Sequence, residues 1–276
     1  MRREDIPAGL RLCRASGWNQ LAQDWELFLA ASPDGCRVAV EDRDLVIGSV
    51  ATLRYGDVFA WISMVLVDPL HRGAGIGTRL LRESLDIIHD VPLARLDATP
   101  EGRPVYAHSG FRDEYRLQRM QRAPKRGTAP FPSLFETRPM TDQDVEGLAS
   151  WDRSVFGADR RLVLDAFRRN APEYAWVATT GSAIEGYAFG RHGYAFEQIG
   201  PVVARSDTCA RTLVARCISA GPDRPFIIDV PLHAAWVAWL STEFTVQRPF
   251  VRMSRGEGLF RENIDQMFAI GGPEFG

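Results

Sequence analysis

Residues 68–78 (DPLHRGAGIGT) have the composition of an anion-binding turn. Three glycines within five positions let the backbone turn tightly and approach a ligand without interference from Cβ atoms. A helix that begins behind them presents unpaired N–H groups and its positive dipole end, which together bind phosphate. Arg72 can add a charge-assisted contact and Thr78 a hydroxyl. The segment therefore predicts a pyrophosphate site, whose backbone contacts come from Gly73, Ala74, Gly75, Ile76 and Gly77.

Other glycine-rich turns set the alternatives to this interpretation. A plain strand-to-helix connection can need glycines for its own geometry. A P-loop requires Lys-Ser or Lys-Thr after its last glycine, but Thr78-Arg79 follows Gly77. A dinucleotide-binding fingerprint requires GxGxxG, whereas this segment is spaced GxGxG. Both nucleotide-binding alternatives fit poorly.

A second segment, residues 106–111 (YAHSGF), lies downstream and offers the phenol of Tyr106. A positioned tyrosine can donate a proton to a leaving group. An isolated tyrosine would be interpreted as a half-buried packing residue with its hydroxyl at the surface. The surrounding pattern decides between the two interpretations.

Together the two segments resemble the Gcn5-related N-acetyltransferase (GNAT) superfamily. Its signature R/Q-x-x-G-x-G/A is matched by Arg72, Gly75 and Gly77, and its Y-x-x-x-G-F by residues 106–111. The first motif follows a predicted strand and a proline-containing loop, and opens a predicted helix with paired leucines, as in that family. The resemblance covers roughly residues 48–120.

The resemblance implies a mechanism and a set of site residues. Family members splay two neighbouring strands, so that the pantetheine arm of acetyl-CoA pairs with backbone groups, here those of Leu66 and Val67. An N–H group there can polarise the thioester carbonyl. The amine attacks directly, and Tyr106 stands where family members place the general acid. Acetyl-CoA is then the cosubstrate, and no metal is expected.

Hydrophobic periodicity predicts the elements that position these segments. The pattern predicts helices over residues 5–30 and 77–89, a short helix over 105–109, and strands over 38–40, 45–53, 59–67 and 93–98. Strands that alternate with helices indicate a mixed α/β fold. With the resemblance, this becomes a central, mostly antiparallel sheet flanked by helices.

The chain is predicted to contain two such domains in tandem. The stretch 123–132 (APKRGTAPFP) reads as a linker, which gives a catalytic domain at 1–122 and a second domain at 133–276. Phe111 and Phe244, Arg119 and Arg252, and Met120 and Met253 are each 133 residues apart, which indicates a duplication. The second half adds a predicted first strand, Phe135–Pro139, for which the first half shows no counterpart.

The second half lacks both chemical motifs. Only Ala210 stands where a motif glycine would be, Asp207 adds negative charge, and Trp239 lies 133 residues after Tyr106. We expect a degenerate GNAT-like domain without a cofactor of its own that helps to form the acceptor pocket. One acetyl-CoA per chain follows.

The acceptor site has several candidate residues, each with a structural alternative. The first half offers Asp24 and Trp25 in its early helical region, and Ser63 on the strand before the turn. The second half offers Glu197, Asp229 and His233. The carboxylates suit a cationic amine and tryptophan a cation–π contact. The alternatives are solvated helix residues, core packing and strand-end hydrogen bonding.

Composition limits the remaining classes of function. The formal net charge is −2 and the isoelectric point about 6.2, so we expect no nucleic-acid or membrane partner. No apolar run approaches the roughly 20 residues of a membrane span. The start lacks the apolar core of a signal peptide, which favours a cytoplasmic protein. The four cysteines form no metal-ligand pattern, and either a monomer or a homodimer is compatible with the sequence.

The leading hypothesis is an N-acetyltransferase that moves an acetyl group from acetyl-CoA to a primary amine of a small molecule. Two alternatives stay open at this stage. One is a non-catalytic, regulatory acyl-CoA-binding module. The other is an acetyltransferase that acts on a protein lysine or N-terminus.

Overall fold

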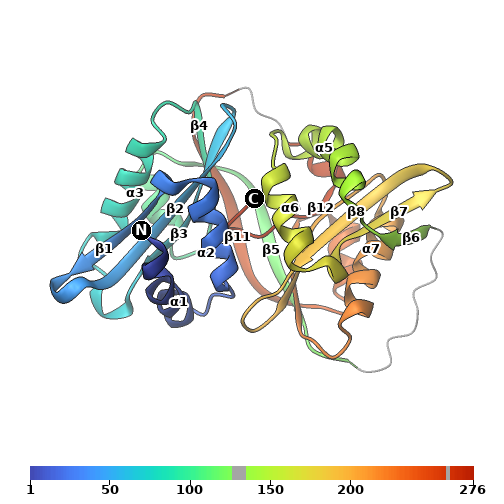
Figure 1. The fold of residues 1–276 in the computed structure, drawn as a ribbon, viewed down its shortest axis with the longest axis horizontal. Helices are drawn as coiled ribbons and strands as arrows, with labels where there is room; N and C mark the ends of the chain where they lie inside the picture. Colours follow the sequence, from blue (N-terminus) through green and yellow to red (C-terminus); the bar gives the residue numbers. More distant parts are fainter. Residues whose placement is uncertain (126–134, 259–261) are drawn as a thin grey trace. The chain divides into compact units, whose positions relative to one another are not determined.

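The structure is a computed structural model that describes residues 1–125, 135–258 and 262–276. The chain forms two compact units (Figure 1). Unit 1 contains residues 1–114, residues 252–258 and Phe275, and unit 2 contains the other described residues. Each unit therefore includes chain from both halves of the sequence.

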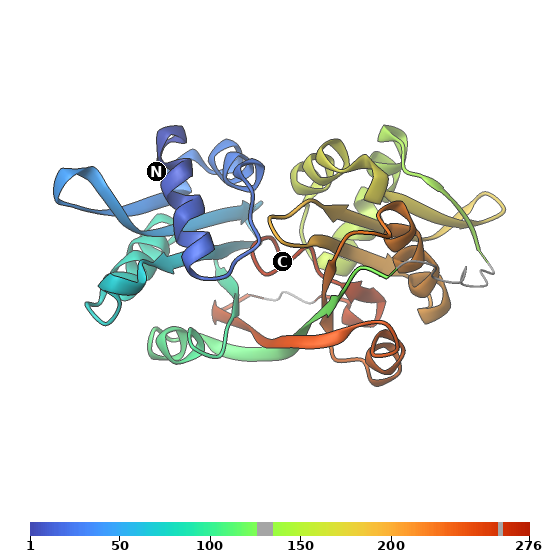
Figure 2. The same cartoon turned by 90° about the horizontal axis from the view of Figure 1, so that it is seen from below.

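Unit 1 is a sheet covered by helices on both faces. Strands β1, β2 and β3 pair antiparallel, and β4 is parallel to β3. Helices α1 and α2 cover one face and α3 the other (Figure 2). The strands are β1 (Cys36–Glu41), β2 (Leu45–Tyr55), β3 (Phe59–Val67) and β4 (Leu93–Ala98). The helices are α1 (Ile6–Ala15), α2 (Ala22–Ala31), α3 (Ile76–Ile87) and α4 (Arg103–His108).

Unit 2 repeats this plan. Strands β6, β7, β8 and β9 form an antiparallel sheet that β10 continues in parallel, and β12 pairs antiparallel with β9. These strands are β6 (Glu136–Pro139), β7 (Trp176–Thr180), β8 (Ala183–Arg191), β9 (Glu197–Ala204), β10 (Phe226–Pro231) and β12 (Met267–Ala269). The helices are α5 (Asp142–Phe156), α6 (Arg161–Asn170), α7 (Asp207–Ala220) and α8 (Ala234–Leu240).

One long strand of each half crosses to the other unit. In β5 (Arg112–Arg122), residues from Tyr115 onward belong to unit 2, where they pair antiparallel with β10. In β11 (Thr245–Gly256), residues from Arg252 onward belong to unit 1, where β11 is the neighbour of β4. The repeat in the sequence gave no indication of this exchange.

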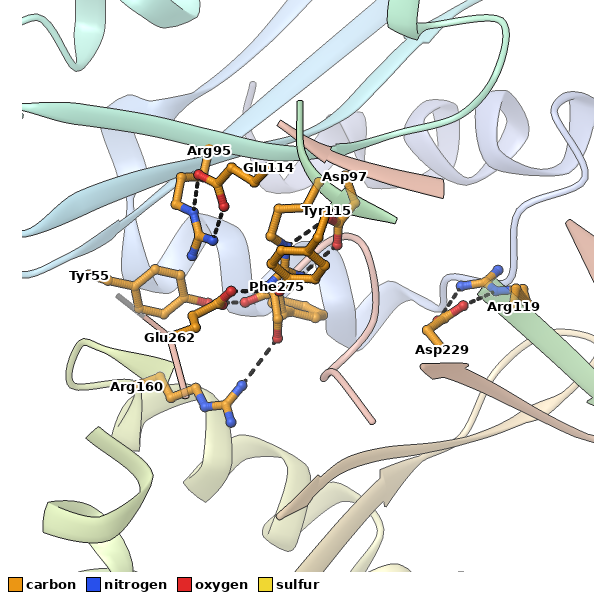
Figure 3. A network of polar contacts seen from close by, with 12 residues as sticks. Tyr55, Arg95, Asp97, Glu114, Tyr115, Arg119, Arg160, Asp229, Glu262 and Phe275 are labelled. Carbon is orange, nitrogen blue, oxygen red and sulfur yellow. Dashed lines mark hydrogen bonds and ion pairs between the residues drawn. The ribbon is translucent and has the colours of Figure 1, made fainter. Parts of the chain in front are cut away.

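A buried ion pair fixes each exchanged strand. In unit 2, the guanidinium of Arg119 donates to both carboxylate oxygens of Asp229, at 2.8 Å and 2.8 Å (Figure 3). In unit 1, Arg252 makes the same two bonds to Asp97, at 2.8 Å and 2.8 Å. All four side chains are almost completely buried. The residues that the duplication relates, Arg119 and Arg252, therefore have equivalent roles.

The predicted mixed α/β fold is confirmed, and β3 and β4 have the predicted bounds. The helical region predicted over residues 5–30 contains two helices, because α1 ends before Gly17, whose positive φ of 66° interrupts the helical path. Residues 126–132 of the predicted linker lie outside the described residues, and the domain limits stay a prediction. Within the described ranges, no strand precedes α1, and no helix is long and apolar enough to cross a membrane.

Candidate active site

The parallel ladder between β3 and β4 is short. It pairs Ala60 with Ala94 and Trp61 with Arg95, and it ends there, although β3 continues to Val67 beside β2. A bulge lies in this second part of β3, where Met64 has a φ of 55° and its carbonyl accepts a 2.9 Å hydrogen bond from the Ser49 hydroxyl. Beyond Trp61, the part of β3 that contains the predicted residues Leu66 and Val67 therefore has no ladder partner on its β4 side among the described strands.

The predicted phosphate turn lies between β3 and α3. It occupies residues 68–75, and Gly73 and Gly75 have φ values of 81° and 78°, which side chains with a Cβ rarely adopt. No heavy atom lies within 4 Å of a Cβ placed on either glycine, so the outer side of the turn is open. Gly75 is the N-cap of α3 and contributes no side-chain cap, which leaves the first N–H groups of the helix available to an anion.

Charged side chains hold the loop in this shape. Asp68 accepts the N–H of Leu70 at 3.1 Å and an ion pair from Arg11 at 2.6 Å, and these contacts lower the pKa of its carboxyl. The Nε of Arg72 donates to the Val67 carbonyl at 3.2 Å, and its Nη2 to the Ser16 hydroxyl at 3.3 Å. Arg72 is exposed at the turn, and these two hydrogen bonds fix the orientation of its guanidinium.

Tyr106 lies on α4 and is half-buried. Its ring packs edge-on against Phe111, with 6.0 Å between centroids, and this burial raises the pKa of the phenol to about 12. Its backbone carbonyl accepts the Phe111 N–H at 3.1 Å, which closes the segment after α4. The Tyr106 hydroxyl has no hydrogen-bond partner among the described residues, so it is free to donate a proton or to bind a ligand.

A groove of about 700 Å³ runs between α3 and α4 within unit 1. It begins at Thr78 in the first turn of α3, next to the glycine turn. Its lining combines apolar, hydroxyl and charged side chains: Thr78, Arg82, Leu85, Asp86, Pro104, Val105, His108, Ser109 and Arg255. Only Thr78 of these residues was predicted from the sequence.

Comparison with protein families agrees with this geometry. Two family profiles, each described as an acetyltransferase (GNAT) domain, match residues 33–113 and 148–269. Together the two spans cover more than half of the chain. The chain belongs to the GNAT acetyltransferases. It is therefore an acyltransferase with two GNAT domains in tandem.

Individual relatives are similar along most of their length. The uncharacterized N-acetyltransferase YitH of Bacillus subtilis is 26% identical over 233 residues, which are 83% of this chain and 79% of YitH. A candidate acetyltransferase from Pyrococcus horikoshii shares the fold, with a TM-score of 0.83, 24% identity, and coverage of 100% of this chain and 94% of the other. A tandem GNAT protein from the clavulanic acid biosynthesis pathway has a TM-score of 0.66, 14% identity and coverage of 92% and 95%.

The acceptor candidates of the first GNAT domain are all buried. Asp24 accepts the Leu21 N–H at 2.7 Å and thereby caps the start of α2. The Nε1 atom of Trp25 and the hydroxyl of Ser63 are buried without a hydrogen-bond partner in the described part of the chain. Buried polar atoms normally have a partner, so these two are open to a ligand or a water molecule. Ser63 lies on the part of β3 that has left β4.

The acceptor candidates of the second GNAT domain already have partners within unit 2. Glu197 accepts from Arg224 at 2.9 Å and contacts His192 at 2.7 Å, and Asp229 holds the exchanged Arg119. His233 is half-buried at the N-cap of α8, with its ring 6.2 Å from that of Phe268. For Glu197 and Asp229, hydrogen bonding inside the unit accounts for their burial.

The second GNAT domain has lost the turn itself. Only Arg205 and Ser206 separate β9 from α7. Ala210, predicted to stand where a motif glycine would be, lies inside α7, as Gly77 lies inside α3. The Ser206 hydroxyl accepts the Cys209 N–H at 3.3 Å and caps the helix. In addition, β12 pairs with Val202 and Val203, and Ile270 N–H donates to the Asp229 carbonyl of β10 at 3.0 Å. The chain thus fills the splay between β9 and β10.

Proposed function

We propose that this GNAT protein transfers the acetyl group of acetyl-CoA to a primary amine of a small molecule by direct attack. The observation that carries the proposal is the uncapped start of α3 behind an open glycine turn, beside the point where β3 and β4 separate. These two features lie in one unit and match the two parts of the cosubstrate, a pyrophosphate and an extended amide-containing arm.

The residues of the turn fit the pyrophosphate. Gly73 and Gly75 have positive φ values, and the absence of atoms within 4 Å of their Cβ positions leaves room for phosphate oxygens. Arg72 supplies a positive charge at the same place. The arm would pair with the backbone groups of Leu66 and Val67, since no strand pairs with that edge of β3 among the described residues.

The reaction exchanges one bond for another. The lone pair of the amine attacks the thioester carbonyl carbon, a C–N bond forms and the C–S bond breaks. The nitrogen loses one proton to water or a base, and the sulfur gains one. An N–H group of the free β3 edge would stabilise the oxygen of the tetrahedral intermediate.

Tyr106 is the proposed proton donor to sulfur. Its pKa of about 12 keeps the phenol protonated at neutral pH, and its hydroxyl has no competing partner among the described residues. A covalent route through cysteine is less suitable, because the cysteines are buried. Burial also raises the pKa of Cys36 to about 11 and those of Cys209 and Cys217 to about 12.

Two observations favour a small acceptor. Ser63 and Trp25 present buried polar atoms without a hydrogen-bond partner in the part of the chain that the structure describes, which suits a ligand that enters the unit rather than a flat protein surface. One similar tandem GNAT protein is assigned to the clavulanic acid pathway, which is small-molecule metabolism. We therefore propose residues 1–122 as the catalytic domain and residues 133–276 as a second GNAT domain without its own cosubstrate.

A thiol-release assay tests this function. The purified chain is incubated with acetyl-CoA and a panel of small primary amines, and free CoA is measured with a disulfide reagent. We expect amine-dependent release of CoA and an acetylated product of the expected mass. Binding of acetyl-CoA without release for any amine would support the regulatory module instead, and release only with lysine peptides or protein N-termini would support a protein acetyltransferase.

A further inference from the structure

The groove between α3 and α4 contains one residue from the far end of the sequence. Arg255 lies on β11, a strand of the second half, and belongs to unit 1 because that strand is exchanged. The buried pair of Arg252 with Asp97 fixes β11 three residues earlier. Thus the exchange gives the groove a cation that the first half does not encode.

The charges in the groove favour an anionic ligand. Three lining residues can carry positive charge, Arg82, His108 and Arg255, and one is acidic, Asp86. Arg82 and Arg255 are exposed and form no ion pair or hydrogen bond among the residues that the structure describes. The Nε of Arg255 lies 3.5 Å from the Cβ position of Gly110, so the guanidinium packs close to the end of α4.

The position of the groove relates it to the proposed cosubstrate. Thr78 belongs both to the first turn of α3 and to the groove lining, so the groove adjoins the site proposed for the pyrophosphate. If the pantetheine arm runs from the pyrophosphate into the space between β3 and β4 beyond Trp61, the adenosine at the other end of the coenzyme must extend from the turn in another direction. This adenosine carries a 3′-phosphate, a group of about −1.5 to −2 charges at neutral pH.

We propose that the second half of the sequence completes the coenzyme site of the first: Arg255, together with Arg82 and His108, binds the 3′-phosphate of coenzyme A. The inference rests on the proposed function, since it concerns the same ligand. Arginine suits this task because its guanidinium offers two parallel N–H donors to a phosphate. The apolar lining, Leu85, Pro104 and Val105, provides surface for the adenine ring.

Calorimetry with CoA and with 3′-dephospho-CoA tests the inference on the whole chain. We expect the unmodified chain to bind CoA about tenfold or more tightly than the dephospho form, a difference of about 1.4 kcal/mol. Arg255→Ala should weaken CoA about tenfold and the dephospho form less than about twofold. Asp86→Asn should tighten CoA about two- to threefold, because it removes a repelling charge without disturbing the fold.

Arg79→Ala is the matched control, because Arg79 is an exposed arginine on α3 that does not line the groove. It should leave the ratio of the two affinities unchanged. Equal affinity of the unmodified chain for both ligands, or an equal loss for both in Arg255→Ala, would overturn the inference while leaving acetyl transfer intact. Failure to bind either ligand would overturn the proposed function as well.

Discussion

The two places where neighbouring strands separate differ in what lies between the strands. In unit 1, β3 leaves β4 after Trp61 and its free edge has no strand partner among the described residues. In unit 2, β9 leaves β10 after Ile199, but β12 pairs with Val202 and Val203 in the space. The same fold therefore gives an open edge in one unit and an edge closed by the chain itself in the other.

The helix that follows each splay shows the same contrast. The start of α3 lies behind an eight-residue loop with Gly75 as an N-cap that offers no side chain. The start of α7 follows a two-residue connection, and Ser206 and the ion pair of Asp207 with Arg211 satisfy its end. When side chains of the protein accept hydrogen bonds from the first N–H groups of a helix, those groups are no longer available to bind an anion. Unit 2 has thus kept its packing while losing the features of a ligand site.

Both units hold an exchanged strand by a buried ion pair. Removing one of these ion pairs gives the largest expected effect, a loss of stability. Arg252→Ala removes the cation that pairs with buried Asp97, and Arg119→Ala removes the cation that pairs with buried Asp229. We expect each variant to lose about 3–5 kcal/mol of unfolding free energy. Urea unfolding followed by circular dichroism measures this loss. A stable Arg252→Ala beside an unstable Arg119→Ala would show that the two pairs are not equivalent.

The glycine turn is present in unit 1 and absent from the described part of unit 2. Gly75→Val should remove the ability of this turn to bind the pyrophosphate. Valine is strained at the φ of 78°, so the turn must rearrange and the N–H groups lose their orientation. We expect acetyl-CoA affinity to fall by about a hundredfold or more, roughly 2.7 kcal/mol, as measured by calorimetry.

Gly56→Val is the matched control for this change. Gly56 also has a positive φ, 59°, with no atom within 4 Å of its Cβ position, but it lies in the turn between β2 and β3. Its backbone strain should lower stability by about 1–3 kcal/mol without a comparable loss of affinity. Equal affinity losses in both variants would contradict a specific role for residues 72–77.

The residues Tyr106 and Trp239 form the next contrast. Tyr106→Phe should lower kcat about a hundredfold with little change in the KM for acetyl-CoA, because only the proton donor is removed. Trp239 stacks on Trp236, with 5.0 Å between centroids, so Trp239→Phe should change stability and leave kcat close to normal. Steady-state kinetics decides, and an unchanged kcat in Tyr106→Phe would refute the acid role.

The raised pKa of Tyr106 gives this contrast a pH dependence. A phenol with a pKa of about 12 donates its proton below that value and loses the ability above it. The fall of kcat that belongs to Tyr106 is therefore expected only as the pH approaches about 12, not near neutral pH. A fall between pH 8 and 9 that disappears in Tyr106→Phe would show that its pKa is lower than burial suggests.

The smallest expected effect comes from the cap of α7. Ser206→Ala removes the hydroxyl that accepts the Cys209 N–H, which should cost about 1 kcal/mol of stability. Affinity for acetyl-CoA should stay unchanged, since this helix end is not proposed to bind it. Thermal unfolding and calorimetry on the same sample measure both quantities, and a weaker affinity would place a second ligand site in unit 2.

Local patterns predicted the elements that carry the proposed chemistry. The alternation in β3 and the glycines before α3 are short-range features, so their positions followed from the sequence. The break at Gly17 was missed because the apolar periodicity continues on both sides of it. The absence of the turn from unit 2 was seen as lost glycines, whereas the structure shows a connection of only two residues.

Long-range pairing could not be predicted. Arg119 and Arg252 were recognised as equivalent positions, but no local pattern shows that each pairs with an aspartate of the other half. For the same reason Arg255 was not expected beside Arg82. The closing of the second splay by β12 depends on a segment about 65 residues after β9, and only tertiary packing brings it there.

The stoichiometry of acetyl-CoA binding tests the central comparison most directly. Calorimetry on the whole chain should give one site per chain, and Gly75→Val should abolish it while Ser206→Ala leaves it in place. Two sites per chain, or a single site that survives Gly75→Val, would contradict the account, because either result would require unit 2 to bind the cosubstrate.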